Sequence, residues 1–216
     1  MYLFPLVGII IGIIIGGLAF GISFYMQPLL TGILITVAFI IITGVTHTDA
    51  LADFADGLMT KGEKEFKHKA MKDPAVGSAG TTAIVIYITG MIIALSSFQS
   101  GIKLFTSIIV SEVIAKYIMV VQAYRGLSAW EGFSSPFTAA MKDKRKIIAS
   151  TAIVLPTIWF VGNSYTGLVS LGLSLAIAEL IQYASSKSFG GISGDVIGAS
   201  NEITRMSCLL IFSSMS

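Results

Sequence analysis

The stretch His47-Thr48-Asp49-Ala50-Leu51-Ala52-Asp53-Phe54-Ala55-Asp56-Gly57 follows 46 residues that contain no Asp, Glu, Lys, Arg or His. Asp49, Asp53 and Asp56 are spaced by four and three residues, so in an α-helix they share one face. Three such carboxylates at about 6 Å repel by roughly 3 kcal/mol per pair at an effective dielectric constant of about 20. We therefore expect a counter-charge here, and a divalent cation held by oxygen ligands would supply it.

The composition predicts an integral membrane protein. Of the 216 residues, 54% are hydrophobic and only 12% are charged, and the mean hydropathy is +0.84. A soluble domain usually carries about twice that share of charged residues. The formal net charge of +2 indicates no general attraction to nucleic acid.

Apolar stretches recur at about the length that a helix needs to cross a bilayer core. They predict an all-α polytopic bundle of six or seven transmembrane helices in one domain, residues 1–216. The expected spans are residues 2–25, 29–46, 77–98, 103–124, 147–163, 166–186 and the shorter, more polar 196–213. Gly8, Gly12 and Gly16 form a ridge of small residues, which favours close helix packing.

The basic residues predict the orientation. They cluster in residues 61–72 and 142–146, whereas residues 26–28 and 163–165 carry no charge. Because positively charged connections stay in the cytoplasm, we expect a cell-membrane protein with its N-terminus inside. This topology places Asp49–Asp56, Arg125 and Asp195 on the cytoplasmic side, where we expect the active site.

Two further motifs carry polar groups. In Lys72-Asp73-Pro74-Ala75-Val76-Gly77-Ser78-Ala79-Gly80, the amides of Gly77 and Ser78 lie near an expected helix start, where anions are favoured. An ordinary helix start explains this motif equally well. In residues 190–202, Asp195 and Glu202 share a helical face, and Gly194 and its neighbouring glycines allow close approach of a phosphorylated ligand.

Several other ionisable residues allow more than one interpretation. Glu112 and Lys116 are four residues apart within an apolar stretch, so they either neutralise each other or leave Lys116 to contact a phosphate. Arg125 either binds phosphate or extends to the membrane interface. His47 is either a general base, a partner of the aspartates or an interfacial histidine.

The donor set favours phosphoryl-type transfer. Cys208 is the only cysteine, so no intrachain disulfide or thiolate metal site can form. Oxygen ligands favour Mg²⁺ or Mn²⁺ over zinc. Such a cation would polarise a diphosphate and orient an alcohol for attack.

The three motifs together resemble those of the cobalamin synthase (adenosylcobinamide-GDP ribazoletransferase) family. His47–Gly57 is similar to H-x-D-G-x-A-D-x-x-D-G, Met71–Gly80 to M-K-D-x-x-[IV]-G-S-x-G, and Gly190–Glu202 to G-G-x-[ST]-G-D-x-x-G-A-x-x-E. The resemblance covers essentially the whole chain. Two departures are Ala50, where the family usually has Gly, and Pro74-Ala75, which replace the more common Ser-Arg.

The resemblance implies a Mg²⁺-dependent reaction at the end of cobalamin synthesis. Adenosylcobinamide-GDP would react with α-ribazole or α-ribazole 5′-phosphate and release GMP. Asp49, Asp53 and Asp56 would hold metal and diphosphate, Lys72 and Asp73 would contact substrate, and Asp195 and Glu202 would complete the site. Lys116 or Arg125 would compensate for the missing arginine. The bilayer is the expected surrounding, and a homo-oligomer is left open.

Two alternatives remain at this point. The residues Asp53-x-x-Asp56-Gly57 match the opening of the CDP-alcohol phosphotransferase motif of phospholipid synthesis, but Thr60-Lys61 stand where Ala-Arg is expected and the later aspartates are missing. A cation-coupled transporter would also place acids within the membrane, but its paired broken helices in two related halves are not evident.

Overall fold

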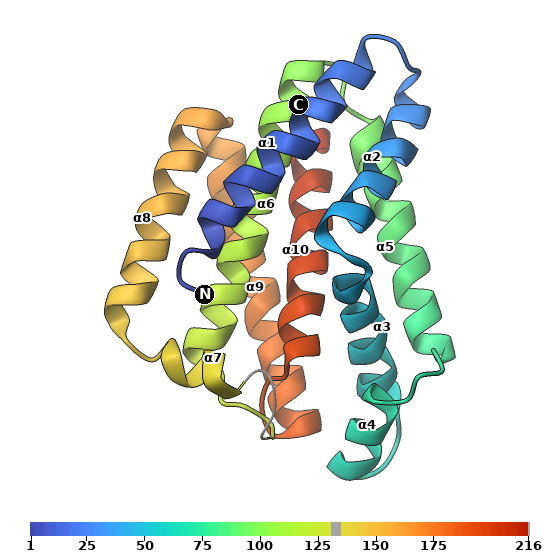
Figure 1. Ribbon diagram of the computed structural model, residues 1–216, viewed down its shortest axis with the longest axis vertical. Helices are drawn as coiled ribbons and strands as arrows, with labels where there is room; N and C mark the ends of the chain where they lie inside the picture. Colours follow the sequence, from blue (N-terminus) through green and yellow to red (C-terminus); the bar gives the residue numbers. More distant parts are fainter. Residues whose placement is uncertain (131–134, 216) are drawn as a thin grey trace.

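The protein is an all-α bundle, as predicted (Figure 1). The computed structural model describes residues 1–130 and 135–215. These residues form no strand, and their ten helices are α1 (Phe4–Ser23), α2 (Pro28–Thr43), α3 (Val45–Met59), α4 (Lys64–Met71), α5 (Ser78–Ser96), α6 (Gly101–Arg125), α7 (Ser135–Ala140), α8 (Lys144–Val161), α9 (Ser164–Phe189) and α10 (Gly194–Ser214). Each stretch predicted to span the membrane is therefore a helix with nearly the expected bounds.

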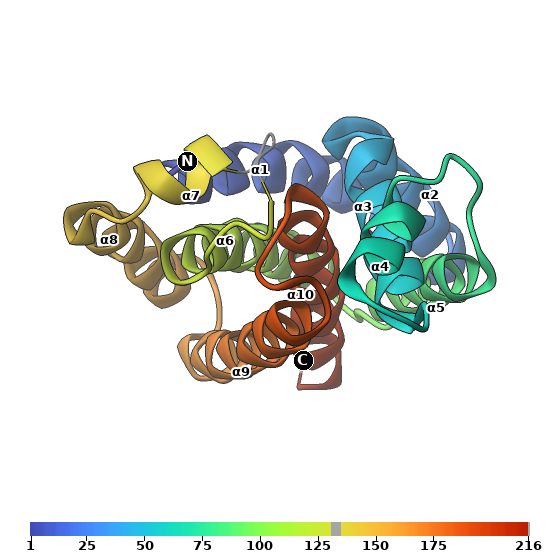
Figure 2. The same cartoon turned by 90° about the horizontal axis from the view of Figure 1, so that it is seen from below.

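Helix α6 forms the centre of the bundle. In its most apolar stretch 89% of the residues are buried, and α1, α8, α9 and α10 surround the helix (Figures 1 and 2). The glycine ridge of α1 lies against it, because a Cβ on Gly8 would stand 2.8 Å from the carbonyl oxygen of Glu112, and one on Gly12 would stand 2.7 Å from the Cα of Ile109. The predicted close helix packing is confirmed.

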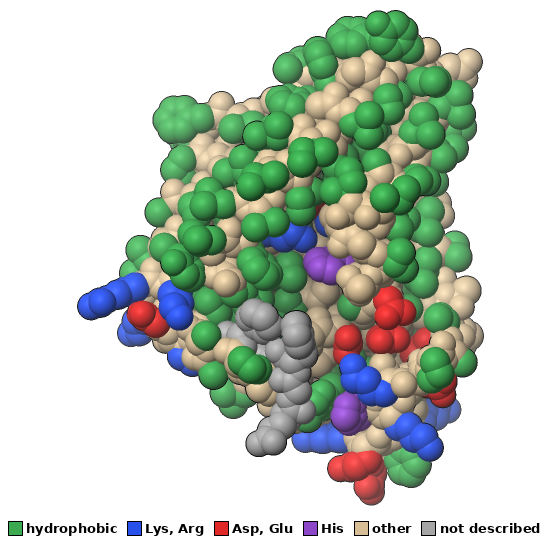
Figure 3. Space-filling view, in the orientation of Figure 1, with side chains coloured by type: hydrophobic (Ala, Val, Ile, Leu, Met, Phe, Trp, Pro, Cys, Tyr) green, Lys and Arg blue, Asp and Glu red, His purple; other side chains and the backbone are tan. Residues whose placement is uncertain are grey.

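Within the described residues, four helices are long and apolar enough to cross a membrane, namely α1, α5, α6 and α9. The pair α2 and α3 adds a fifth if it is counted as one bent span. The predicted spans 147–163 and 196–213 are helical in α8 and α10, but three basic residues begin α8 and three ionisable residues lie in α10. This architecture is that of a polytopic membrane bundle. Hydrophobic side chains cover most of the face in Figure 3, and charged ones gather toward one end.

A sharp bend separates α2 from α3. The two helices meet at an angle of 92°, and Gly44 between them has a φ of 83°, in the left-handed region that favours glycine. The bend lets α3 leave the line of α2 and run beside α5 and α10 (Figure 1). It thus places the aspartates of α3 between the starts of those two helices.

Candidate active site

Asp56 is bound by the first residues of α5. Its carboxylate accepts hydrogen bonds from the backbone N–H groups of Gly77 at 2.7 Å and Gly80 at 2.9 Å. Both positions require glycine, because a Cβ on either would come closer than 3.0 Å to this carboxylate. The helix start predicted to attract an anion thus holds a carboxylate of the chain itself. Ser78, the first residue of α5, is exposed.

The second and third motifs meet beside this carboxylate. Lys72 forms an ion pair with Asp195, with 3.2 Å between the Nζ and Oδ2 atoms. Asp53 interacts electrostatically with both of these residues and with Asp49 and Asp56. The structure therefore brings together the three aspartates of the first motif, Lys72 of the second and Asp195 of the third.

Two of these carboxylates have no protein partner. Asp49 is exposed and Asp53 is half-buried, and neither makes a hydrogen bond or ion pair within residues 1–130 and 135–215. By contrast, Asp73 accepts a hydrogen bond from the backbone N–H of Ala75 at 2.9 Å, within its own loop. Asp49 and Asp53 are thus the carboxylates available to a ligand.

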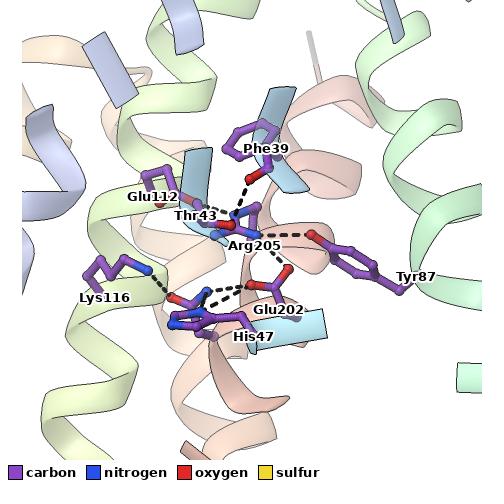
Figure 4. Close-up of polar contacts among 9 residues, drawn as sticks. Phe39, Thr43, His47, Tyr87, Glu112, Lys116, Glu202 and Arg205 are labelled. Atoms are coloured by element: carbon purple, nitrogen blue, oxygen red, sulfur yellow. Dashed lines mark hydrogen bonds and ion pairs between the residues drawn. The ribbon is translucent and has the colours of Figure 1, made fainter. Parts of the chain in front are cut away.

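Glu202 belongs to a different, buried cluster centred on Arg205 (Figure 4). The Arg205 guanidinium is fully buried. It donates to Glu202 at 2.6 Å, to the Tyr87 hydroxyl at 3.0 Å and to Glu112. The carboxylate of Glu202 is therefore engaged by an arginine rather than by the groups around Asp53. The spacing of three residues between Glu202 and Arg205 could have indicated this pair, but the sequence analysis did not consider it.

Lys116 does not pair with Glu112, as the neutralisation reading expected, but donates to the Oδ1 atom of Asn201 at 3.0 Å. An ammonium group has no acceptor, so Asn201 must direct its oxygen toward Lys116 and its amide nitrogen away from it. That nitrogen lies 2.8 Å from Glu202 and 3.2 Å from the Nδ1 atom of His47. The role of Asn201 was missed in the sequence.

This chain of hydrogen bonds sets the tautomer of His47. Because the Asn201 amide donates to Nδ1, a neutral His47 carries its proton on Nε2. Its Nδ1 atom is also 3.5 Å from a carboxylate oxygen of Glu202. His47 is partly exposed and lines a pocket of about 350 Å³ together with Gly194 and Asp195. It can thus donate a hydrogen bond to a bound ligand.

Arg125 and Gly194 take no part in these contacts. Arg125 forms an ion pair with Glu179 of α9, and both side chains are about half exposed. Gly194 is exposed, and nothing lies within 4 Å of a Cβ built on it. The surroundings of Gly194 thus leave room for a ligand, whereas Arg125 already has a partner.

Comparison with known proteins gives the family. The model of the cobalamin-5-phosphate synthase family matches residues 1–213. The chain belongs to this family. Curated relatives named adenosylcobinamide-GDP ribazoletransferase include that of Methanocella arvoryzae, 35% identical over 81% of this chain and 71% of the relative. The relative from Thermococcus onnurineus is 34% identical over 87% of this chain and 78% of its own length.

The similarity also extends along nearly the whole chain in one case. The relative from Methanococcoides burtonii is 29% identical over 97% of this chain and 80% of its own length. No solved structure gives a significant match. The three motifs of this cobalamin-5-phosphate synthase family member therefore occur in a chain that is similar to its relatives along most of its length.

Proposed function

We propose that this member of the cobalamin-5-phosphate synthase family is an adenosylcobinamide-GDP ribazoletransferase. It joins the adenosylcobinamide phosphate group to α-ribazole or α-ribazole 5′-phosphate and releases GMP. The observation that carries the proposal is the position of two unpartnered carboxylates, Asp49 and Asp53, beside the Lys72–Asp195 ion pair. The family match favours this reaction over CDP-alcohol transfer and ion transport.

The reaction breaks one bond to phosphorus and forms another. A hydroxyl of the ribazole attacks the phosphorus on the cobinamide side of the diphosphate, and the bond from that phosphorus to the GMP oxygen breaks. Asp53 accepts the hydroxyl proton, because it is half-buried beside Lys72 and has no partner of its own. Lys72, which is exposed, binds a diphosphate oxygen in place of Asp195.

His47 acts in this mechanism as a hydrogen-bond donor. Its Nε2–H group is directed by the Asn201 amide on the other side of the ring, so it can bind a phosphoryl oxygen as charge develops there. This role is not among the three that the sequence left open for His47. It replaces the general base, because a base at Nε2 would need the opposite tautomer.

The residues also fit a magnesium ion bound together with the substrate. Within the described part of the chain, no three His, Cys, Asp or Glu side chains form a metal site by themselves. Mg²⁺ is usually held by one or two carboxylates, substrate phosphates and water. Asp49 and Asp195 would hold it, and when bound it would neutralise the charge of the diphosphate.

We place this site at the cytoplasmic surface of the cell membrane. The aspartates of α3 lie near the end of the bundle where basic side chains gather (Figure 3), and lysines favour the cytoplasmic side. The exposed apolar side chains of α1 and α2 would face lipid. A substrate that carries a large polar corrinoid could then reach the site from the cytoplasm.

A product assay tests the proposal. Purified protein with Mg²⁺, adenosylcobinamide-GDP and α-ribazole should release GMP in proportion to the cobamide formed. The variant Asp53→Asn should abolish this release, whereas Glu65→Gln, which changes an exposed acid of α4, should not. Release of CMP from a CDP-linked lipid without any GMP would contradict the proposal, and so would ion flux without either product.

A further inference from the structure

The pocket lined by His47, Gly194 and Asp195 lies next to the aspartates and has been given no ligand so far. Its volume is about 350 Å³, and its lining includes Phe4, His47, Met119, Gly194, Asp195 and Ile197. A second pocket of about 230 Å³ shares three of these residues and extends to Lys116. The two pockets therefore lie next to each other between helices α1, α2, α3, α6 and α10.

The lining combines apolar walls with a few polar groups, as is typical of small-molecule sites. Phe4, Met119 and Ile197 come from three different helices. An aromatic ring and a thioether are good partners for a flat aromatic ligand. Asp195 supplies a hydrogen-bond acceptor in the same space, beside the His47 ring that binds the phosphoryl oxygen. The chemistry thus suits a heteroaromatic ring that carries hydroxyl groups.

The size of the pocket excludes the corrinoid part of the donor. Pockets for drug-sized ligands have volumes of about 300–1,000 Å³, and this one is near the lower limit. A nucleoside such as α-ribazole has the right size, whereas a corrinoid is several times larger. The corrinoid must therefore remain outside the pocket. The guanosine of the donor is also of nucleoside size, and the KM of each substrate in pocket variants distinguishes the two nucleosides.

We infer that this pocket binds the acceptor nucleoside, with its aromatic base between Phe4 and Met119 and its ribose directed toward Asp195. The inference rests on the proposed function and adds the position of the acceptor to it. The attacking hydroxyl then lies on the side of the pocket nearest to Lys72, because Asp195 both lines the pocket and pairs with that lysine. The acceptor and the diphosphate approach the site from different sides.

Substitutions that fill or strip the pocket test the inference. Met119→Trp adds bulk to both pockets and should raise the KM for α-ribazole by about tenfold or more, while the KM for adenosylcobinamide-GDP changes by less than about twofold. Phe4→Ala should act in the same direction. The matched control is Met26→Trp, in the exposed connection at the opposite end of the bundle (Figure 1), which should change neither value.

Direct binding separates this inference from the proposed function. Equilibrium dialysis of radiolabelled α-ribazole should detect binding to the wild-type protein and about a tenfold loss in Met119→Trp, whether or not the protein turns over. If the wild type releases GMP but the KM and binding of α-ribazole are unchanged in both pocket variants, the inference is wrong and the function stands. A rise in the donor KM alone also overturns it. Should Met119→Trp fail to fold, as judged by size-exclusion chromatography, Phe4→Ala decides.

Discussion

Replacing Asp56 should show that this aspartate stabilises the fold, whereas Asp49 and Asp53 face the ligand. Asp56→Ala leaves the N–H groups of Gly77 and Gly80 without their acceptor. A hydrogen bond to a charged group contributes about 1.5–3 kcal/mol, and loss of a helix cap costs about 0.5–2 kcal/mol. Asp56 is only half-buried, so water partly replaces it. We expect a loss of about 2–3 kcal/mol in the free energy of unfolding.

Thermal unfolding in detergent measures this loss. For a chain of this length, 1 kcal/mol corresponds to about 2–4 °C in Tm, so Asp56→Ala should unfold about 5–10 °C below the wild type. Asp49→Asn and Asp53→Asn should keep or slightly raise the Tm, because they remove repulsion between neighbouring carboxylates and break no hydrogen bond. Both should nevertheless abolish GMP release.

A glycine substitution at the start of α5 tests the same contact between Asp56 and Gly80. Gly80→Ala places a Cβ against the Asp56 carboxylate and 3.0 Å from the carbonyl oxygen of Ala52, so its Tm should fall about as far as that of Asp56→Ala. Gly172→Ala is the control, because nothing lies within 4 Å of the added Cβ. If Asp56→Ala and Gly80→Ala both unfold at the wild-type temperature, the carboxylate does not hold the start of α5 and the reasoning is refuted.

Three further predictions follow from the remaining contacts. Lys72→Gln should raise the KM for adenosylcobinamide-GDP about tenfold and leave that for α-ribazole unchanged, which steady-state kinetics would detect. Arg205→Met should lower the free energy of unfolding by about 3–5 kcal/mol, because it leaves two buried carboxylates unpaired; an unchanged Tm would contradict this. Lys116→Met should let Asn201 turn and shift the tautomer of His47, which ¹⁵N NMR of the imidazole would report in a protein that also carries His68→Gln.

Removal of the metal tests the cofactor separately from the side chains. EDTA should stop GMP release, and Mg²⁺ should restore it. The Tm should change little on chelation, because the described residues contain no cation cage built from protein groups alone. Full activity after exhaustive chelation would contradict a Mg²⁺-dependent reaction.

The helices and the meeting of the three motifs could be predicted from the sequence, because both depend on local properties. Apolar length indicates a helix in a membrane, and charged residues must converge when few other polar groups are present. The bend at Gly44 between α2 and α3 was not predicted. It depends on a single positive φ, which a glycine permits but does not require.

The partners of the acids were harder to predict than their positions. Glu202 shares a helical face with Asp195, but its carboxylate binds Arg205 one turn farther along the same helix. Glu112 is four residues from Lys116 yet also binds Arg205. Spacing along one helix shows which pairs can meet, whereas the choice among them depends on side chains that other helices supply. Asn201 is the clearest case, because its orientation is set by Lys116 from α6.

The buried cluster around Arg205 explains how motifs far apart in the sequence are held at matching depths in the bundle. Its members come from α5, α6 and α10, and Asn201 and Glu202 extend its contacts to His47 at the start of α3 (Figure 4). A buried guanidinium tolerates little displacement, since each lost partner leaves an uncompensated charge. A shift of any of these helices along its axis would break one of these bonds. The cluster therefore fixes the depth of α3 relative to α5 and α10, and with it the approach of Asp53 to Lys72 and Asp195.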